Sequence, residues 1–192
     1  MNRREQKREL IILTARNIFS LFGLNKTTME QIARTTRMGK ATLYHYFRDK
    51  EHLLYEVFRR ETRMLMDAIN DSVKDITNPK DKLRKYIHVR MNYLNKLVIA
   101  NSALRDDYLN HLSSVQKIRS KFNNYEIQML SSIIQNGIDN RVFTVPDVSE
   151  IIKVFAIALR GMEISLMTDS FRKNDPAQIN LLTDTLLYGI CK

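Results

Sequence analysis

The chain has 192 residues, 44% of them hydrophobic and 27% charged, with one cysteine, which excludes extensive intrinsic disorder and an internal disulfide framework. Only 5 glycines and 3 prolines occur, which argues against a turn-rich β fold and favours an all-α fold. The formal net charge is +10, and residues 1–50 hold 11 basic and only 4 acidic side chains. This distribution points to a polyanion, either nucleic acid or an anionic membrane surface, with a solvated basic surface as the alternative.

Three short helices are predicted in this basic segment. Apolar residues at 3.6-residue spacing predict a first helix that ends at Gly23, where a glycine suits the C′ position. Capping-box patterns place the start of the second helix at Thr27 or Thr28. After an interruption over residues 35–39, a third helix is expected over Lys40–Phe47. Two short helices joined by such a turn are typical of a helix-turn-helix.

Long helices are predicted for the rest of the chain. About nine helices and no strand are expected in total, with no targeting or membrane-spanning segment. The first of these long helices is capped by Asp49 and ends near Ile76. The next stretch starts at Asn78-Pro79 and ends near Phe143, with breaks expected near Asn101–Ser102 and His111–Ser114. A further helix is expected from Asp147 to about Thr168, and the last one starts at Asp175-Pro176.

The helix predicted over residues 151–167 is apolar on nearly all sides, so both of its sides must be covered. One side fits the core of the domain. The other carries small, uncharged residues that would let a second helix approach closely. We therefore predict that this helix takes part in a homodimer. The alternative is a monomer in which it is a central core helix. The expected interface residues are Val154, Ala158, Gly161 and Ser165.

Residues 27–54 carry a motif that extends well beyond a simple helix-turn-helix. Its members are Thr27-Thr28, Ile32-Ala33, Lys40-x-Thr42-Leu43-Tyr44-x-Tyr46-Phe47 and Lys50-Glu51-x-Leu53-Leu54. The segment resembles the DNA-binding signature of the tetracycline-repressor (TetR) family. The resemblance implies a DNA-binding domain at residues 1–50 and a helical ligand-binding and dimerisation domain at residues 51–192.

The residue types in the third helix suit contact with a duplex. Leu43, Tyr46 and Phe47 would anchor the helix, leaving its polar side in the major groove. Lysine suits guanine acceptors, and hydroxyl and ammonium groups suit phosphate oxygens. An arm formed by Arg3, Arg4, Lys7 and Arg8 could follow the DNA backbone or enter the minor groove. The predicted DNA-contacting residues are Thr28, Arg37, Lys40, Ala41, Thr42, Tyr44, His45 and Lys50.

The segment departs from the family pattern at three positions. Arg37 stands where the family usually has a glycine in the turn, Gly39 where serine or alanine usually starts the third helix, and Ala41 where glycine or proline is common. A residue other than glycine in a left-handed turn costs of order 1 kcal/mol. A contact between Arg37 and a phosphate could offset this cost.

No enzyme motif occurs, and no cofactor or metal site is predicted. His45 and Asp49 have i, i+4 spacing but fall on the expected DNA-binding side. Polar and methionine side chains of the larger domain are candidates for orienting an effector, and each is more commonly a surface or core residue. Arg90 and Tyr93 lie among them, and the predicted ligand-binding residues are His88, Met91, Tyr108, His111, Tyr125, Met129, Phe155 and Met162.

The function expected from these features is that of a homodimeric, sequence-specific DNA-binding regulator in the cytoplasm. The resemblance implies a repressor that a small, mostly apolar effector releases from a near-palindromic operator, with the helix after Asp49 joining the two domains. A non-specific basic helical module that binds nucleic acid or an anionic membrane surface is the alternative. An enzyme built on a helical bundle is a third possibility.

Overall fold

The computed structural model describes residues 2–100, 112–167 and 176–191 and forms two compact units. The first unit consists of Met1–Arg63 with Val98–Arg119, and the second of Met64–Leu97 with Ser120–Lys192. The expected division of function at residue 50 stays a prediction.

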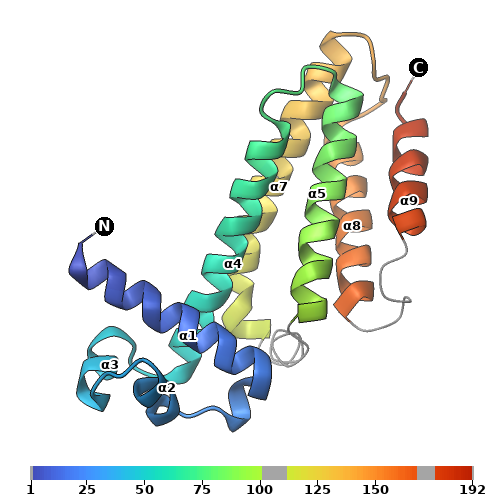
Figure 1. Cartoon of the computed structure of the whole chain (residues 1–192). Helices are drawn as coiled ribbons and strands as arrows, with labels where there is room; N and C mark the ends of the chain where they lie inside the picture. Colours follow the sequence, from blue (N-terminus) through green and yellow to red (C-terminus); the bar gives the residue numbers. More distant parts are fainter. Residues whose placement is uncertain (1, 101–111, 168–175, 192) are drawn as a thin grey trace. The chain divides into compact units, whose positions relative to one another are not determined.

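The first unit contains three helices and the first turns of a fourth. They are α1 (Arg3–Lys26), α2 (Met29–Thr35), α3 (Lys40–Tyr46) and the beginning of α4 (Lys50–Val73). Figure 1 shows the short α2 and α3 beside each other, near α1. The predicted helix-turn-helix is therefore present in the residues expected to form it.

Local sequence explains where these helices begin and end. Gly23 interrupts α1 with a φ of 75°, a conformation that glycine adopts without steric cost. Thr28 is the N-cap of α2, and its hydroxyl accepts a hydrogen bond from the Gln31 amide at 3.1 Å. At the start of α4, the Asp49 side chain accepts a hydrogen bond from the His52 amide at 2.7 Å. The roles of Gly23 and Asp49 agree with the prediction. Of the two threonines that the sequence offered as the start of the second helix, Thr28 is the N-cap.

Apolar side chains from all four helices form the core of the first unit. α1 supplies the side chains that its 3.6-residue spacing predicts, and the short helices each supply a few anchors. The core residues with at most 2% exposure are Ile11, Ile12, Ala15, Phe19, Leu24, Ile32, Leu43, Phe47, Leu53, Leu54 and Val57.

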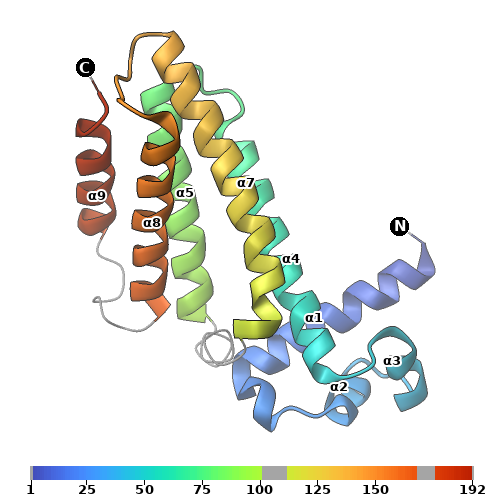
Figure 2. The same cartoon turned by 180° about the vertical axis from the view of Figure 1, so that it is seen from behind.

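The second unit is a bundle of helices that run alongside one another (Figures 1 and 2). Its helices are the remainder of α4, α5 (Pro79–Ala100), α7 (Leu112–Asp139), α8 (Val148–Met167) and α9 (Pro176–Tyr188). α5 and α7 also extend into residues of the first unit.

The predicted start signals of α5 and α8 are confirmed. The Asn78 side chain accepts from the Lys80 amide at 2.9 Å, with Pro79 as the first helical residue of α5. Asp147 accepts from the Glu150 amide at 3.1 Å at the start of α8. The helix α4 ends at Val73, three residues before the end expected near Ile76.

Each helix of the second unit contributes to one apolar core. Its buried side chains come from α4, α5, α7, α8 and α9. The residues with at most 2% exposure are Ile69, Leu83, Tyr86, Ile87, Met91, Leu130, Ile133, Ile134, Phe143, Phe155, Leu159, Leu187 and Ile190.

The all-α prediction is confirmed. The described ranges contain eight helices and, instead of strands, one isolated antiparallel bridge between Phe143 and Cys191. The break expected at Asn101–Ser102 lies outside the described residues. Of the break expected at His111–Ser114, only His111 lies outside them, and α7 begins at Leu112. Within the part of the chain that the structure describes, none of the helices is long and apolar enough to cross a membrane.

Candidate nucleic-acid interface

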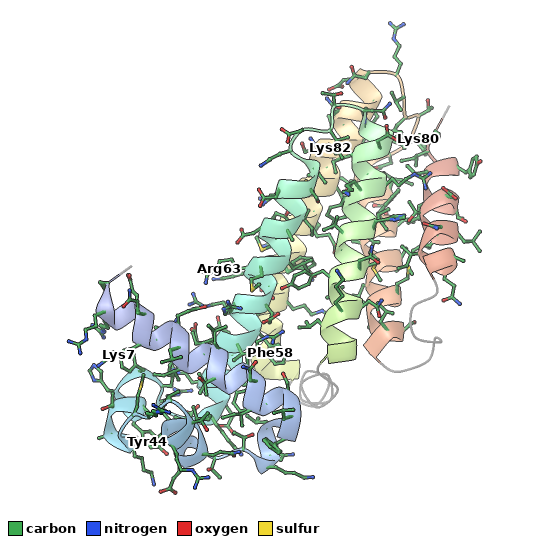
Figure 3. All side chains as sticks on the ribbon, viewed as in Figure 1. Lys7, Tyr44, Phe58, Arg63, Lys80 and Lys82 are labelled. Atoms are coloured by element: carbon green, nitrogen blue, oxygen red, sulfur yellow. The ribbon has the colours of Figure 1, made fainter. Side chains whose placement is uncertain are left out.

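The helix α3 separates its anchoring side chains from its polar ones. Leu43 and the C-cap residue Phe47 are fully buried, and Tyr46 is half-buried against the same core. Five of the predicted DNA-contacting residues form the other side, and all five are exposed: Lys40, Ala41, Thr42, Tyr44 and His45. Tyr44, which is labelled in Figure 3, is 44% exposed despite its size. The exposed side therefore combines a cation, hydroxyls and an imidazole.

The turn before α3 takes the strained form that the sequence suggested. Arg37 adopts a φ of 56°, which is unfavourable for any residue with a Cβ atom. The Arg37 amide donates to the Arg34 carbonyl at 3.1 Å, and the Met38 amide donates to the Ala33 carbonyl at 2.9 Å. These two bonds form a Schellman motif, in which glycine usually occupies the position of Arg37. The exposed guanidinium of Arg37 remains available to a ligand.

The other two predicted contact residues already have structural roles. The hydroxyl oxygen of Thr28 caps α2, and Thr28 is exposed. The ammonium of Lys50 donates to the Leu24 carbonyl at 3.1 Å, which ties the start of α4 to the end of α1. Lys50 is half-buried, so it offers less charge to a duplex than Lys40 does.

The basic residues at the N-terminus belong to a helix rather than to an extended arm. α1 begins at Arg3 with a capping box formed by Asn2 and Glu5. Arg3 and Arg4 are exposed in its first turn, and Lys7 is half-exposed. Arg8 instead pairs with Glu56, with a distance of 2.6 Å between Nη2 and Oε2.

Further ion pairs join α1 to α4 within the first unit. Arg16 Nε lies 2.6 Å from Oε1 of Glu61, whose side chain is 5% exposed. Arg60 Nε lies 2.5 Å from Oε1 of Glu9. The sequence did not single out these pairs, since their members lie 45 to 51 residues apart.

Five of the predicted ligand-binding residues come together in the core of the second unit: Met91, Tyr125, Met129, Phe155 and Met162. The Tyr125 hydroxyl donates to the Asn70 side chain at 2.9 Å, and burial raises its pKa to about 12. His88 is half-buried outside this cluster, and burial together with Arg84 lowers its pKa. Tyr108 and His111 lie outside the described residues.

A buried charged network in the second unit is the main feature that sequence reasoning missed. Arg90 is 1% exposed, and its Nη2 donates to Glu163 Oε2 at 2.9 Å. Its Nε lies 2.8 Å from Glu126 Oε1, an ion-pair distance without hydrogen-bond alignment. Burial opposes the charge of Arg90, but the two carboxylates outweigh it and raise its pKa. The sequence signal that could have revealed this network is the position of Arg90, a basic residue on the apolar face of α5.

Tyr86 completes this network. Its hydroxyl donates to Glu126 Oε1 at 2.8 Å, and its side chain is fully buried. Burial and the Glu126 charge raise the pKa of Tyr86 well above its usual value, so the phenol keeps its proton. The network joins α5, α7 and α8 by polar contacts inside an otherwise apolar core.

The predicted dimer residues lie on the open side of α8. Val154 is 49% exposed, and a Cβ placed on Gly161 would meet no atom within 4 Å. Ala158 and Ser165 are half-buried. Sequence reasoning missed the two isoleucines of this side, Ile157 at 71% and Ile164 at 43% exposure, because it selected for small residues.

No cluster of three or more potential metal ligands occurs among the residues that the structure describes. The histidine of α3, His45, packs edge-on against Tyr46, with 5.5 Å between the ring centroids. The polar side of α3 thus has the chemistry of a binding surface.

Comparison with known proteins agrees with this chemistry. The sequence model described as "Bacterial regulatory proteins, tetR family" matches residues 11–57, which include α2, α3 and their connection. The chain is 19% identical to the HTH-type transcriptional regulator YhgD of Bacillus subtilis (strain 168), over 97% of this chain and 95% of that protein. It is 24% identical to the fatty acid metabolism regulator protein of the same organism, over 71% of this chain and 73% of that protein.

A solved structure extends the likeness to the whole fold. The crystal structure of a transcriptional regulator from Cytophaga hutchinsonii ATCC 33406 has a TM-score of 0.77 and 26% identity, covering 96% of this chain and 98% of that one. The likeness includes both the helix-turn-helix and the helices that follow it in the chain. Residues 11–57 therefore match the DNA-binding segment of the TetR family, and the chain as a whole is similar to bacterial transcriptional regulators.

Proposed function

We propose that the chain is a homodimeric repressor that binds a near-palindromic operator and is released by a small, mostly apolar effector. The observation that carries the proposal is the sorted surface of α3, where Leu43 and Phe47 are buried and the polar side chains of Lys40, Thr42, Tyr44 and His45 are exposed. A helix anchored in this way can present Lys40, Thr42 and Tyr44 to base edges and phosphates in a major groove.

The open side of α8 supports the homodimer. Val154, Ile157 and Ile164 expose apolar surface around Gly161, and Leu181 and Tyr188 of α9 are 69% and 83% exposed. Exposed apolar surface of this kind is typical of protein interfaces. A two-fold dimer would place its two α3 helices in successive major grooves, about 34 Å apart, and a near-palindrome offers this spacing.

The core of the second unit supports an effector with a large apolar part. Met91, Met129 and Met162 are adaptable side chains in one cluster with Phe155. One similar protein is named as a regulator of fatty acid metabolism. An effector would release DNA only through a higher affinity for the conformation that does not bind the operator.

The test begins with selection of duplexes from a random pool by the full-length chain, followed by footprinting. The proposal expects a site with two related half-sites one helical turn apart and one dimer, or a multiple of it, on each site. Affinity should fall steeply with added salt, because Lys40 and its neighbours displace counterions from phosphates.

The same protein is then titrated with a panel of fatty acids, sterols and lipophilic cations. We expect one class to raise the melting temperature and to lower operator affinity together. Selection of no preferred sequence, or a monomer on a single half-site, would contradict the proposal.

A further inference from the structure

Few side chains fix the position of α3. The helix has seven residues, too few for independent stability in water, and Leu43 is its one buried residue. The second full anchor is Phe47 at the C-cap, which has no exposed surface. Any group that holds the Phe47 ring therefore helps to hold the C-terminal end of α3.

Arg8 of α1 is such a group. Its guanidinium carbon lies 5.3 Å from the centroid of the Phe47 ring, within the range of a cation–π interaction. The His52 ring of α4 lies 5.7 Å from the same ring, measured between centroids. The residue that ends α3 is thus in contact with both α1 and α4.

Glu56 of α4 fixes Arg8 in this place. The distance between Arg8 Nη2 and Glu56 Oε2 is 2.6 Å, and Arg59 Nη2 lies 2.7 Å from the same oxygen. The Glu56 side chain is 9% exposed. Burial opposes its ionisation, but the hydrogen bonds and charges of Arg8 and Arg59 outweigh burial and lower its pKa. The carboxylate is therefore charged at neutral pH and holds the guanidinium over the ring.

We propose that Arg8 is a positioning residue for DNA recognition, which holds α3 through Phe47 and is itself held by Glu56. The proposal rests on the proposed function, since it takes α3 as the helix that binds DNA. It gives Arg8 a different role from Arg3 and Arg4, whose exposed side chains can reach a phosphate directly.

Neutralising Glu56 separates positioning from a direct phosphate contact. An Arg8 that contacted a phosphate would be released by Glu56→Gln, and binding would stay equal or improve. An Arg8 that positions α3 would lose its anchor in the same variant, and specific binding would fall. The two roles therefore predict opposite signs.

The experiment uses the full-length chain, the duplex that it selects from a random pool, and a scrambled duplex of the same length. We expect Arg8→Gln and Glu56→Gln each to weaken binding to the selected duplex about tenfold. Binding to the scrambled duplex should change by less than about threefold, since the phosphate contacts of other residues remain. Arg8→Lys, which keeps the charge, should restore part of the loss.

Arg16→Gln is the matched control. Arg16 also joins α1 to α4, through a 2.6 Å pair with Glu61, whereas the cation over the Phe47 ring is that of Arg8. The control should lower stability and keep the wild-type ratio between the two duplexes. Phe47→Leu keeps an apolar anchor but removes the ring, so Arg8→Gln should have little further effect in that background. Circular dichroism sets a temperature at which every variant is folded.

An unchanged ratio in Arg8→Gln would overturn this inference alone. So would a loss in Arg8→Gln that Glu56→Gln does not share, or additive effects of Arg8→Gln and Phe47→Leu. Failure of the wild-type chain to prefer any duplex would overturn the proposed function and this inference together.

Discussion

The ion pairs between α1 and α4 of the first unit and the Arg90 network of the second unit lie in different surroundings. In the first unit, each pair between α1 and α4 keeps its arginine near solvent, as with the 35% and 28% exposed side chains of Arg8 and Arg16. In the second unit, Arg90 and both of its carboxylates are at most 9% exposed. The first arrangement links helices at the edge of an apolar core, and the second places ions inside one. Removal of a single charge should therefore have very different consequences in the buried network and in the exposed pairs.

The largest expected effect is that of Arg90→Met. This change removes the guanidinium shared by Glu126 and Glu163, and buried carboxylates without a cation are strongly destabilising. We expect the free energy of unfolding in urea to fall by about 3–5 kcal/mol.

Arg84→Met is the matched control on the same helix. Arg84 pairs with Asp184 at 2.6 Å, but both side chains are more than a third exposed. Its loss should cost about 1 kcal/mol or less. Equal destabilisation by the two changes would show that burial of the Arg90 network is unimportant for stability.

A large effect is also expected where the second unit exposes apolar surface. Gly161→Glu places a charge among Val154, Ile157 and Ile164, where a Cβ atom has open space in the monomer. Two such charges would face each other across a two-fold interface. Sedimentation should show a rise in the dimer dissociation constant of about a hundredfold or more.

Ser149→Glu adds the same charge at the start of α8 and should leave the dimer intact. A Gly161→Glu chain that remains dimeric would place the subunit interface on another surface.

The smallest expected effect concerns two arginines in the same strained conformation, one in each unit. Arg37 has a φ of 56° after α2, and Arg141 has a φ of 58° after α7. The amides that follow both helices donate in the Schellman pattern, with Val142 bonded to the Gly137 carbonyl at 2.8 Å. Glycine at either position should raise the free energy of unfolding by about 0.5 kcal/mol, since relief of strain exceeds the added chain entropy.

DNA binding should separate these two variants. Arg37→Gly should weaken operator binding and reduce the slope of log affinity against log salt by about 1, as expected for one lost phosphate contact. Arg141→Gly should leave both quantities at the wild-type value. Equal binding by the two variants would remove Arg37 from the interface.

The first unit could be predicted from sequence nearly element by element. Gly23, Thr28 and Asp49 are short-range signals that act on their own neighbours, so their spacing is sufficient. The sorting of Leu43 and Phe47 from the polar side of α3 follows from helical periodicity for the same reason.

Long-range contacts could not be predicted in this way. The pairing of Arg90 with Glu163 joins residues 73 positions apart, and nothing in their local sequence selects one partner over another. The hydrogen bond from Lys50 to the Leu24 carbonyl and the contact of Arg8 with the Phe47 ring likewise depend on the packing of whole helices. The preference for small residues on α8 missed Ile157 because exposure depends on which neighbours cover a face.

The central claim is that the exposed side of α3 binds a specific DNA sequence. The most direct test is a fluorescence anisotropy titration of Lys40→Ala combined with Tyr44→Ala, using the duplex selected by the wild-type chain. Lys80→Ala, which removes one exposed cation from the second unit, is the control (Figure 3). We predict that the double variant stays folded and loses about a hundredfold in affinity or more, while the control binds as the wild type does. Wild-type affinity in a folded double variant would contradict the claim.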